Sequence, residues 1–144
     1  MKLNFSFKNR KFGFYLRIVA AALALVVAIA YLIIDLTIIK GNISFGDYTY
    51  VVVPSAIVGA LLLAANAFTG IWLLDLAGSV LLGVALGQHL SMSCYPWADM
   101  STGVPFFVNN GALASAVSTI YTIFVVLFAV AMLASVASSF MDRD

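Results

Sequence analysis

Four long runs of apolar residues, separated by short polar stretches, account for most of the chain. They cover residues 12–39, 48–68, 71–90 and 112–140. An α-helix needs roughly 20 mainly apolar residues to cross the hydrocarbon core of a bilayer, and each run is long enough. The connections "KGNISFGDY" and "FTG" are short, and only residues 88–111 form a loop of any size. The pattern predicts an all-α fold, a transmembrane four-helix bundle that forms a single domain.

Composition agrees with a membrane protein and excludes several other classes. Of the 144 residues, 64% are hydrophobic and 9% are charged, and the mean hydropathy is +1.11, which excludes an ordinary soluble domain. A net charge of +1, with no basic stripe among aromatic residues, argues against a nucleic-acid partner. Cys94 is the only cysteine, so no internal disulfide can form and a dithiol oxidoreductase is excluded.

The distribution of basic residues predicts the orientation of the chain. Five of them precede or begin the first span, one follows it and one lies at the C-terminus: Lys2, Lys8, Arg10, Lys11 and Arg17, then Lys40, then Arg143. Cytoplasmic flanks are rich in Lys and Arg, so both termini are expected in the cytoplasm. The basic start followed by an apolar run also resembles a secretory signal peptide. The run continues to residue 39, beyond the roughly 7–15 residues of a signal core, which favours an uncleaved first span.

Four ionisable groups lie within the predicted spans, and their spacing suggests two pairs. Arg17 and Asp35 fall on one face of the first helix, while Asp75 and His89 lie near the same two levels of the third. Charged groups inside a membrane usually face another helix or a partner, so we expect Arg17 to meet Asp75 and Asp35 to meet His89. Eighteen residues separate Arg17 from Asp35, but only fourteen separate Asp75 from His89. At 1.5 Å per residue, the two spacings differ by roughly 6 Å. In the alternative interpretation Arg17 snorkels to the headgroups and Asp35 pairs locally near Lys40.

Small residues accompany these ionisable groups on both helices. Such residues let helices approach closely in lipid, where hydrophobicity gives little reason for helices to associate. We therefore expect the first and third helices to pack directly on one another through this stripe. Its members are Ala21, Ala24 and Ala28 on the first helix, and Gly78, Ser79, Gly83 and Gly87 on the third.

No arrangement of residues points to catalysis, a metal or a cofactor. His89 is the only histidine, so bis-histidine haem ligation within one chain is impossible. The segment "HLSMSCYPWAD" places His89, Met92, Cys94 and Asp99 close together, but their spacing matches no zinc pattern. The hydroxyl residues scattered along the fourth span suit hydrogen bonds between helices better than the lining of a pore. We expect no enzyme, no catalytic residues, no metal and no cofactor.

The opening "NFSFKNRKFGFYLRIVAAALALVVAIAYLI" carries a family resemblance. Its basic and aromatic "KNRKFGFYL", leading directly into the first span, resembles a group of small, uncharacterised four-span membrane proteins of anaerobic Gram-positive bacteria. The resemblance is clearest over the N-terminal part of the chain. It implies a bacterial origin and a plasma-membrane location, and it supplies no functional residues.

Together these observations favour a non-enzymatic, multi-pass protein of the bacterial plasma membrane that acts as an accessory or interaction subunit. Its expected partners are the lipid bilayer and either another membrane protein or a second copy of the chain. The alternative is a small oligomeric transporter or channel in which an intramembrane Asp handles a proton or cation.

Overall fold

The computed structural model describes residues 11–39, 49–103, 107–108 and 111–141, with side chains of the last helix from residue 115 onward. The basic residues Lys2, Lys8 and Arg10 lie outside these ranges, as do Lys40 and the rest of the first connection. The positions on which the predicted orientation mainly rests are therefore outside the described residues.

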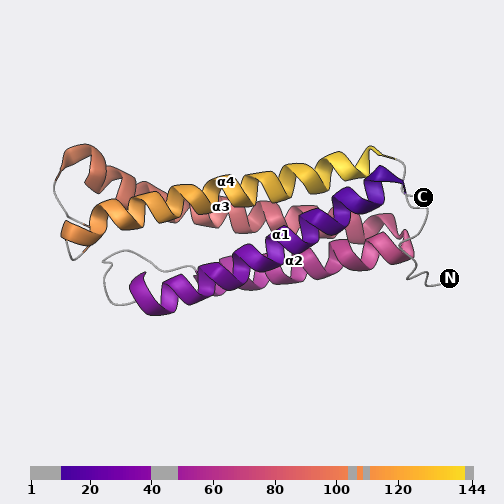
Figure 1. Cartoon of the computed structure of the whole chain (residues 1–144), viewed down its shortest axis with the longest axis horizontal. Coiled ribbons are helices and arrows are strands. Elements are labelled where there is room, and N and C mark those ends of the chain that lie inside the picture. The colour runs from indigo at the N-terminus through magenta and orange to yellow at the C-terminus, as the bar shows by residue number, and fades with distance from the viewer. Residues whose placement is uncertain (1–10, 40–48, 104–106, 109–110, 142–144) are drawn as a thin grey trace.

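Four long helices form the bundle (Figure 1). Helix α1 spans Phe12–Ile34 and continues as a single π-helical turn, η1, at Asp35–Ile39. Helices α2, α3 and α4 span Thr49–Thr69, Trp72–Thr102 and Gly111–Ser139. All four are long and apolar enough to cross a membrane, so the chain has the all-α, membrane-spanning architecture that the apolar runs predict.

The two ends of the bundle can be distinguished by their helix termini. At one end, here called the near end, α1 begins, α4 ends and a short turn at Gly70 joins α2 to α3 (Figure 1). Gly70 has a φ of 72°, a left-handed conformation that glycine adopts without steric cost. At the other end, the far end, η1 ends, α2 begins and α3 gives way to α4.

Helix α3 continues twelve residues beyond its predicted apolar run, which ends at residue 90. The prediction of a loop over residues 88–111 is wrong for its first half. Polar residues lower the local hydropathy there without interrupting the helix, and Pro96 removes only one backbone donor. The helix ends where Gly103 takes a φ of 73° and donates its N–H to the Asp99 carbonyl at 2.9 Å.

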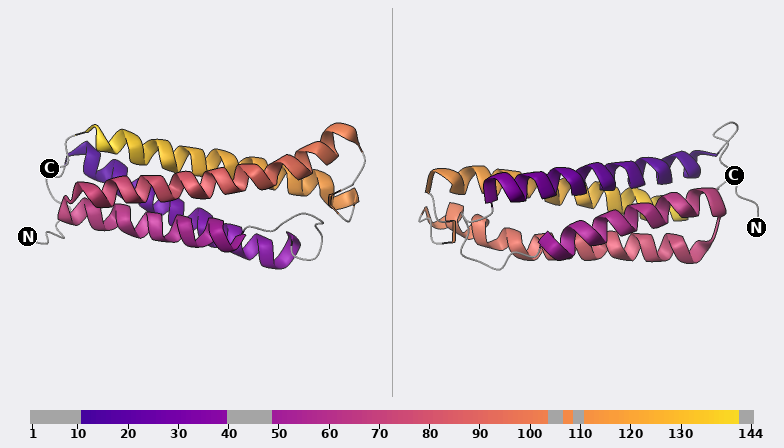
Figure 2. Two further views of the ribbon diagram at one scale, coloured as in Figure 1. Left: turned by 180° about the vertical axis from the view of Figure 1, so that it is seen from behind. Right: turned by 90° about the horizontal axis from the view of Figure 1, so that it is seen from below.

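Each helix packs against two neighbours, in the cyclic order α1, α2, α3, α4 (Figure 2). Helices α1 and α3 therefore lie diagonally across the bundle, and the expected direct packing of these two helices is wrong. Gly78 approaches α2 instead, where a Cβ atom on it would lie 2.8 Å from Leu63 Cγ and 3.0 Å from the Gly59 carbonyl. Gly83 faces Met132 of α4, and around Gly87 there is open space.

The alanines of the predicted stripe pack in the core with residues of the neighbouring helices. Ala21 and Ala24 belong to a buried cluster with Ala60, Leu63, Leu82 and Ala131. Ala28 belongs to a second cluster, toward the far end, with Tyr31, Val52, Val53, Ala56, Phe124 and Phe128 among its members. The three alanines thus face the bundle interior, where they are covered mainly by α2 and α4.

Candidate functional site: two buried polar clusters

The first polar cluster lies inside the near half of the bundle and is called here the ion-pair cluster. It consists of Arg17, Asp75, the Ser138 carbonyl and the Ser139 hydroxyl. The structure brings Arg17 and Asp75 together across the bundle diagonal, with Arg17 Nε 3.2 Å from Asp75 Oδ1. Both residues are buried, at 0% and 3% exposure. The Arg17 side chain therefore points inward and does not snorkel to the membrane surface.

Helix α4 supplies the remaining polar groups around this ion pair. Arg17 Nη2 donates to the Ser138 carbonyl at 3.0 Å and lies 3.5 Å from Asp75 Oδ2. The Ser139 hydroxyl donates to the same carboxylate oxygen. Close by, Ser79 and Ser135 share a hydrogen bond of 3.1 Å between α3 and α4. Charged groups in a low-dielectric interior are costly unless paired and hydrogen-bonded, and these partners meet that requirement.

A lateral cleft of about 310 Å³ between α3 and α4 reaches this cluster. Its lining includes the polar residues Asp75, Ser79 and Ser139 and the exposed aromatic residues Trp72 and Phe140. Arg17 thus binds the Asp75 carboxylate from inside the bundle, and the same carboxylate borders the cleft between α3 and α4. Charge at this position is neutralised within the protein.

The second polar cluster lies in the far half and is called here the histidine cluster. It consists of His89, Tyr31, Ser93 and the Tyr121 carbonyl. His89 is fully buried; its Nε2 lies 2.8 Å from the Tyr121 carbonyl and its Nδ1 lies 3.0 Å from the Tyr31 hydroxyl. A carbonyl can only accept, so Nε2 carries a hydrogen, and in a neutral imidazole Nδ1 then accepts from Tyr31. The Ser93 hydroxyl bonds back to the His89 carbonyl at 2.8 Å.

Aromatic rings enclose the imidazole of His89. The ring centroids of Tyr31 and Tyr121 lie 5.0 and 4.9 Å from it, and those of Phe124 and Phe128 both lie 6.0 Å away. Most of these contacts are edge-on or tilted, which are favourable arrangements for aromatic pairs. His89 is therefore a core residue whose two nitrogens are both engaged.

Asp35 is not the partner of His89, and helix register explains why. From Arg17 to Tyr31 there are 31 − 17 = 14 residues, and from Asp75 to His89 there are 89 − 75 = 14. Parallel helices with equal spacing place Tyr31 level with His89, whereas Asp35 lies one turn farther along. The expected mismatch of roughly 6 Å is therefore avoided by using Tyr31. Asp35 instead begins η1 and is 5% exposed.

The two clusters are separated by an apolar layer. Fourteen residues correspond to about 21 Å along a helix. Within that distance, Ala24, Leu63, Leu82 and Ala131 of the four helices are all fully buried. Beyond the histidine cluster, Met92 and Val108 are also fully buried and pack with Val117 and Tyr121. The polar groups of the two clusters thus sit in separate compartments of a packed core.

Hydrogen bonds join the end of α3 to Phe107 and Val108 and to α4. Both Asp99 carboxylate oxygens accept from the Phe107 N–H, at 3.1 and 3.0 Å, and Oδ2 also accepts from the Val108 N–H at 2.8 Å. Trp97 Nε1 donates to the Thr122 hydroxyl of α4 at 2.9 Å. Asp99 therefore ties Phe107 and Val108 to the end of α3, and the carboxylate has a structural role.

The His89, Met92, Cys94 and Asp99 group of the sequence does not assemble into a ligand set. Cys94 is exposed and bonds back to the Leu90 carbonyl, while His89 is enclosed by aromatic rings. Among the described residues, no group of three or more His, Cys, Asp or Glu side chains could hold a metal ion. Comparison of the chain with protein-family models, with curated proteins and with solved structures finds no match.

Proposed function

We propose that this integral membrane protein is a non-enzymatic accessory or interaction subunit of the bacterial plasma membrane, with both termini in the cytoplasm. The observation that carries the proposal is that the ionisable groups of both polar clusters have partners within the protein. Arg17 and Asp75 neutralise one another, and both His89 nitrogens have partners. An apolar layer lies between the two clusters. These features favour a structural role for the buried polar groups over the handling of a proton or cation.

The extension of α3 supplies a surface for a partner. A helix of 31 residues is about 46 Å long, against roughly 30 Å for a hydrocarbon core. Its last turns carry an exposed face that includes Cys94, Tyr95 and Ala98. Asp99 and Trp97 anchor these turns to the rest of the bundle, so the face is held rigidly. In the proposed orientation this face lies outside the cytoplasm, against the membrane surface, where another membrane protein or a second copy can reach it.

Site-specific photo-crosslinking in cells tests the proposal. A photoreactive residue at Tyr95 or Ala98 is expected to give one discrete adduct. The same residue at Val80, which is 55% exposed in the apolar part of α3, serves as the matched lipid-facing control. An adduct of twice the protein's mass identifies a second copy as the partner. Equal adduct patterns at all three positions contradict an interaction face on the α3 extension.

Flux measurement tests the transporter alternative. Proteoliposomes with a pH-sensitive dye are expected to show the same proton leak as protein-free vesicles. Proton or cation movement that is lost in Asp75→Asn would contradict the accessory role and support transport.

A further inference from the structure

Helix α3 carries an amide side chain, Gln88, that makes no hydrogen bond to any described residue. Gln88 follows the exposed Trp72 by 88 − 72 = 16 residues, or about 24 Å, which is within the roughly 30 Å of a hydrocarbon core. Other polar side chains of the spans, those of Arg17, Asn66 and His89, hydrogen-bond inside the bundle. In lipid a Gln amide finds its partner on a neighbouring helix, so Gln88 indicates a contact with another polypeptide.

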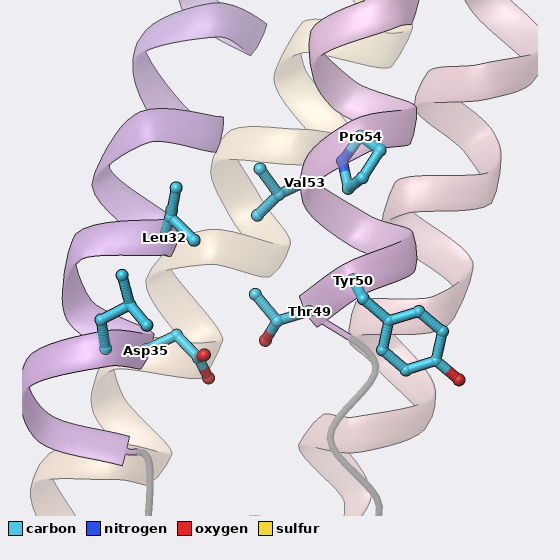
Figure 3. Close-up of a pocket in the computed structure, with 7 residues that line it drawn as sticks. Leu32, Asp35, Thr49, Tyr50, Val53 and Pro54 are labelled. Carbon is cyan, nitrogen blue, oxygen red and sulfur yellow. The ribbon is translucent and has the colours of Figure 1, made fainter.

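The polar groups at the far ends of α1 and α2 differ from Gln88 in this respect. A crevice of about 330 Å³ lies between these ends, and its polar lining consists of Asp35, Thr49 and Tyr50 (Figure 3). All three interact with other groups of the chain, and the Tyr50 ring points away from the Asp35 carboxylate. The exposed Thr37 hydroxyl donates back to the Ile33 carbonyl of its own helix. These groups are satisfied within one chain, so the site for a partner is placed on α3.

Gln88 lies beside small residues on the exposed face of α3. At about 100° per residue, Gly87, Gln88, Ser91, Tyr95 and Ala98 fall within an arc of about 100°. Gln88 is partly buried and the other four are exposed. Around Gly87 a Cβ atom would meet nothing within 4 Å, so no contact inside the chain requires a glycine there. A glycine weakens a helix relative to alanine, and the close approach of a second helix accounts for its presence.

The chemistry of the Gln88 side chain favours a second copy of the chain as the partner. A carboxamide has both N–H donors and a carbonyl acceptor, so two Gln88 side chains can satisfy one another. Two copies that are inserted in the same direction are related by a twofold axis along the membrane normal, and each residue of α3 is then level with its counterpart. Gly87 and Ser91, four positions apart, let the two helices approach closely.

We propose that two copies of the chain form a dimer in which the α3 helices cross between Gly87 and Ser91 and the two Gln88 side chains hydrogen-bond to each other. Helices that meet at small residues commonly cross at about −40°. Val80 lies nine residues, or about 14 Å, before the midpoint of this crossing, so the helix axes are about 9 Å farther apart at its level. Val80 therefore stays in contact with lipid. The inference rests on the proposed interaction face of the α3 extension, and it names a second copy as the partner.

Sedimentation equilibrium of the full chain in density-matched micelles measures the dissociation constant of the dimer. Gln88→Leu is expected to raise this constant about tenfold, which corresponds to the loss of two hydrogen bonds between helices. Gly87→Leu forces the two backbones apart and is expected to raise it at least as much. Ala77→Leu is the matched control, because it enlarges an exposed small residue of the same helix away from the crossing. Its dissociation constant is expected to stay within about twofold of the natural value.

A natural protein that stays monomeric at every concentration overturns the inference, and so does a dissociation constant that neither variant changes. Circular dichroism in the same micelles establishes that the variants are folded. Should either variant fail to fold, single cysteines in a Cys94→Ser background replace it. Ser91→Cys is then expected to give a disulfide-linked dimer under mild oxidation, and Val80→Cys is not. Equal crosslinking at the two positions overturns the inference.

Photo-crosslinking in cells separates this inference from the proposed function. A discrete adduct of Tyr95 or Ala98 with a different protein, together with a monomer in micelles, overturns the dimer but leaves the interaction face intact. Equal adduct patterns at Tyr95, Ala98 and Val80 contradict both the interaction face and the dimer. An adduct of twice the protein's mass that is lost in Gln88→Leu supports both.

Discussion

The near and far halves of the bundle use the same four helices but are held together in different ways. The near half combines small residues with a charged pair: Gly59 and Gly78 bring α2 and α3 close together, and Arg17 meets Asp75 across the diagonal. The far half is filled by aromatic rings around a fully buried His89. One half holds an ion pair beside small residues, and the other holds an imidazole among aromatic rings.

The difference shows how the size of a side chain sets the polar contact it can make. Small residues let the backbones approach, and the long Arg17 side chain then spans the diagonal to Asp75. In the far half the rings of Tyr31, Tyr121, Phe124 and Phe128 fill the space, so a shorter imidazole reaches Tyr31 and the Tyr121 carbonyl. In lipid, packing and hydrogen bonds of this kind drive helix association.

Removing one charge from the ion-pair cluster should have the largest effect. Asp75→Leu leaves Arg17 as an uncompensated buried charge, which is expected to lower the free energy of unfolding by about 3–5 kcal/mol. The measurement is reversible unfolding in mixed detergent micelles. The double variant Arg17→Met with Asp75→Leu removes both charges and is expected to recover more than half of that loss. Equal destabilisation in the single and double variants would show that the pairing does not matter.

Filling the close approach of α2 and α3 should have the next largest effect. In Gly78→Ala the added methyl group would lie 2.8 Å from Leu63 Cγ and 3.0 Å from a backbone oxygen. Overpacking of this kind costs about 1–3 kcal/mol, measured by the same unfolding assay. Gly87→Ala is the matched control, because its methyl group meets nothing within 4 Å. Similar results for the two glycines would argue against a tight near half.

The histidine cluster should respond less, because it holds no charged pair. Tyr31→Phe keeps the ring but removes the hydrogen bond to His89, with an expected cost of about 1 kcal/mol. Tyr95→Phe, on the exposed face of α3, is expected to leave stability unchanged. If Tyr31→Phe lowered the free energy of unfolding more than Asp75→Leu does, the ranking of the two clusters would be reversed.

The smallest effect is expected at the hydrogen bond between Ser79 and Ser135. Hydrogen bonds between helices in membranes contribute about 0.6 kcal/mol on average, so Ser79→Ala should cost about that amount. Ser115→Ala, at an exposed position of α4, provides the comparison. A loss above about 2 kcal/mol would mean that the serine pair supports the ion-pair cluster more strongly than one hydrogen bond can.

Hydrophobic length alone predicted most of the fold, because a bilayer admits few architectures for long apolar segments. Helices α1, α2 and α4 begin and end within a residue or so of their apolar runs, counting η1 with α1. The end of α3 could not be predicted in this way, because hydropathy indicates which residues suit the hydrocarbon core and not where a helix ends. Gly103, seven residues after Pro96 and the last residue of "STG", was the available signal for the helix end.

The ion-pair cluster could be predicted in part, since a charge inside a span requires a partner. The histidine cluster could not, because its partners are a tyrosine and a backbone carbonyl, and neither stands out in an apolar sequence. Equal spacing was the missing criterion: fourteen residues separate Arg17 from Tyr31, as they separate Asp75 from His89. The diagonal arrangement of α1 and α3 could not be predicted either, because a stripe of small residues does not identify which neighbouring helix covers it.

The matched spacing on α1 and α3 has a mechanical consequence. A single contact between two rods leaves them free to pivot about it, whereas two contacts fourteen residues apart fix both their sliding and their rotation. Because α3 runs unbroken from Trp72 to Thr102, the register that these two contacts fix extends to the far turns of the helix.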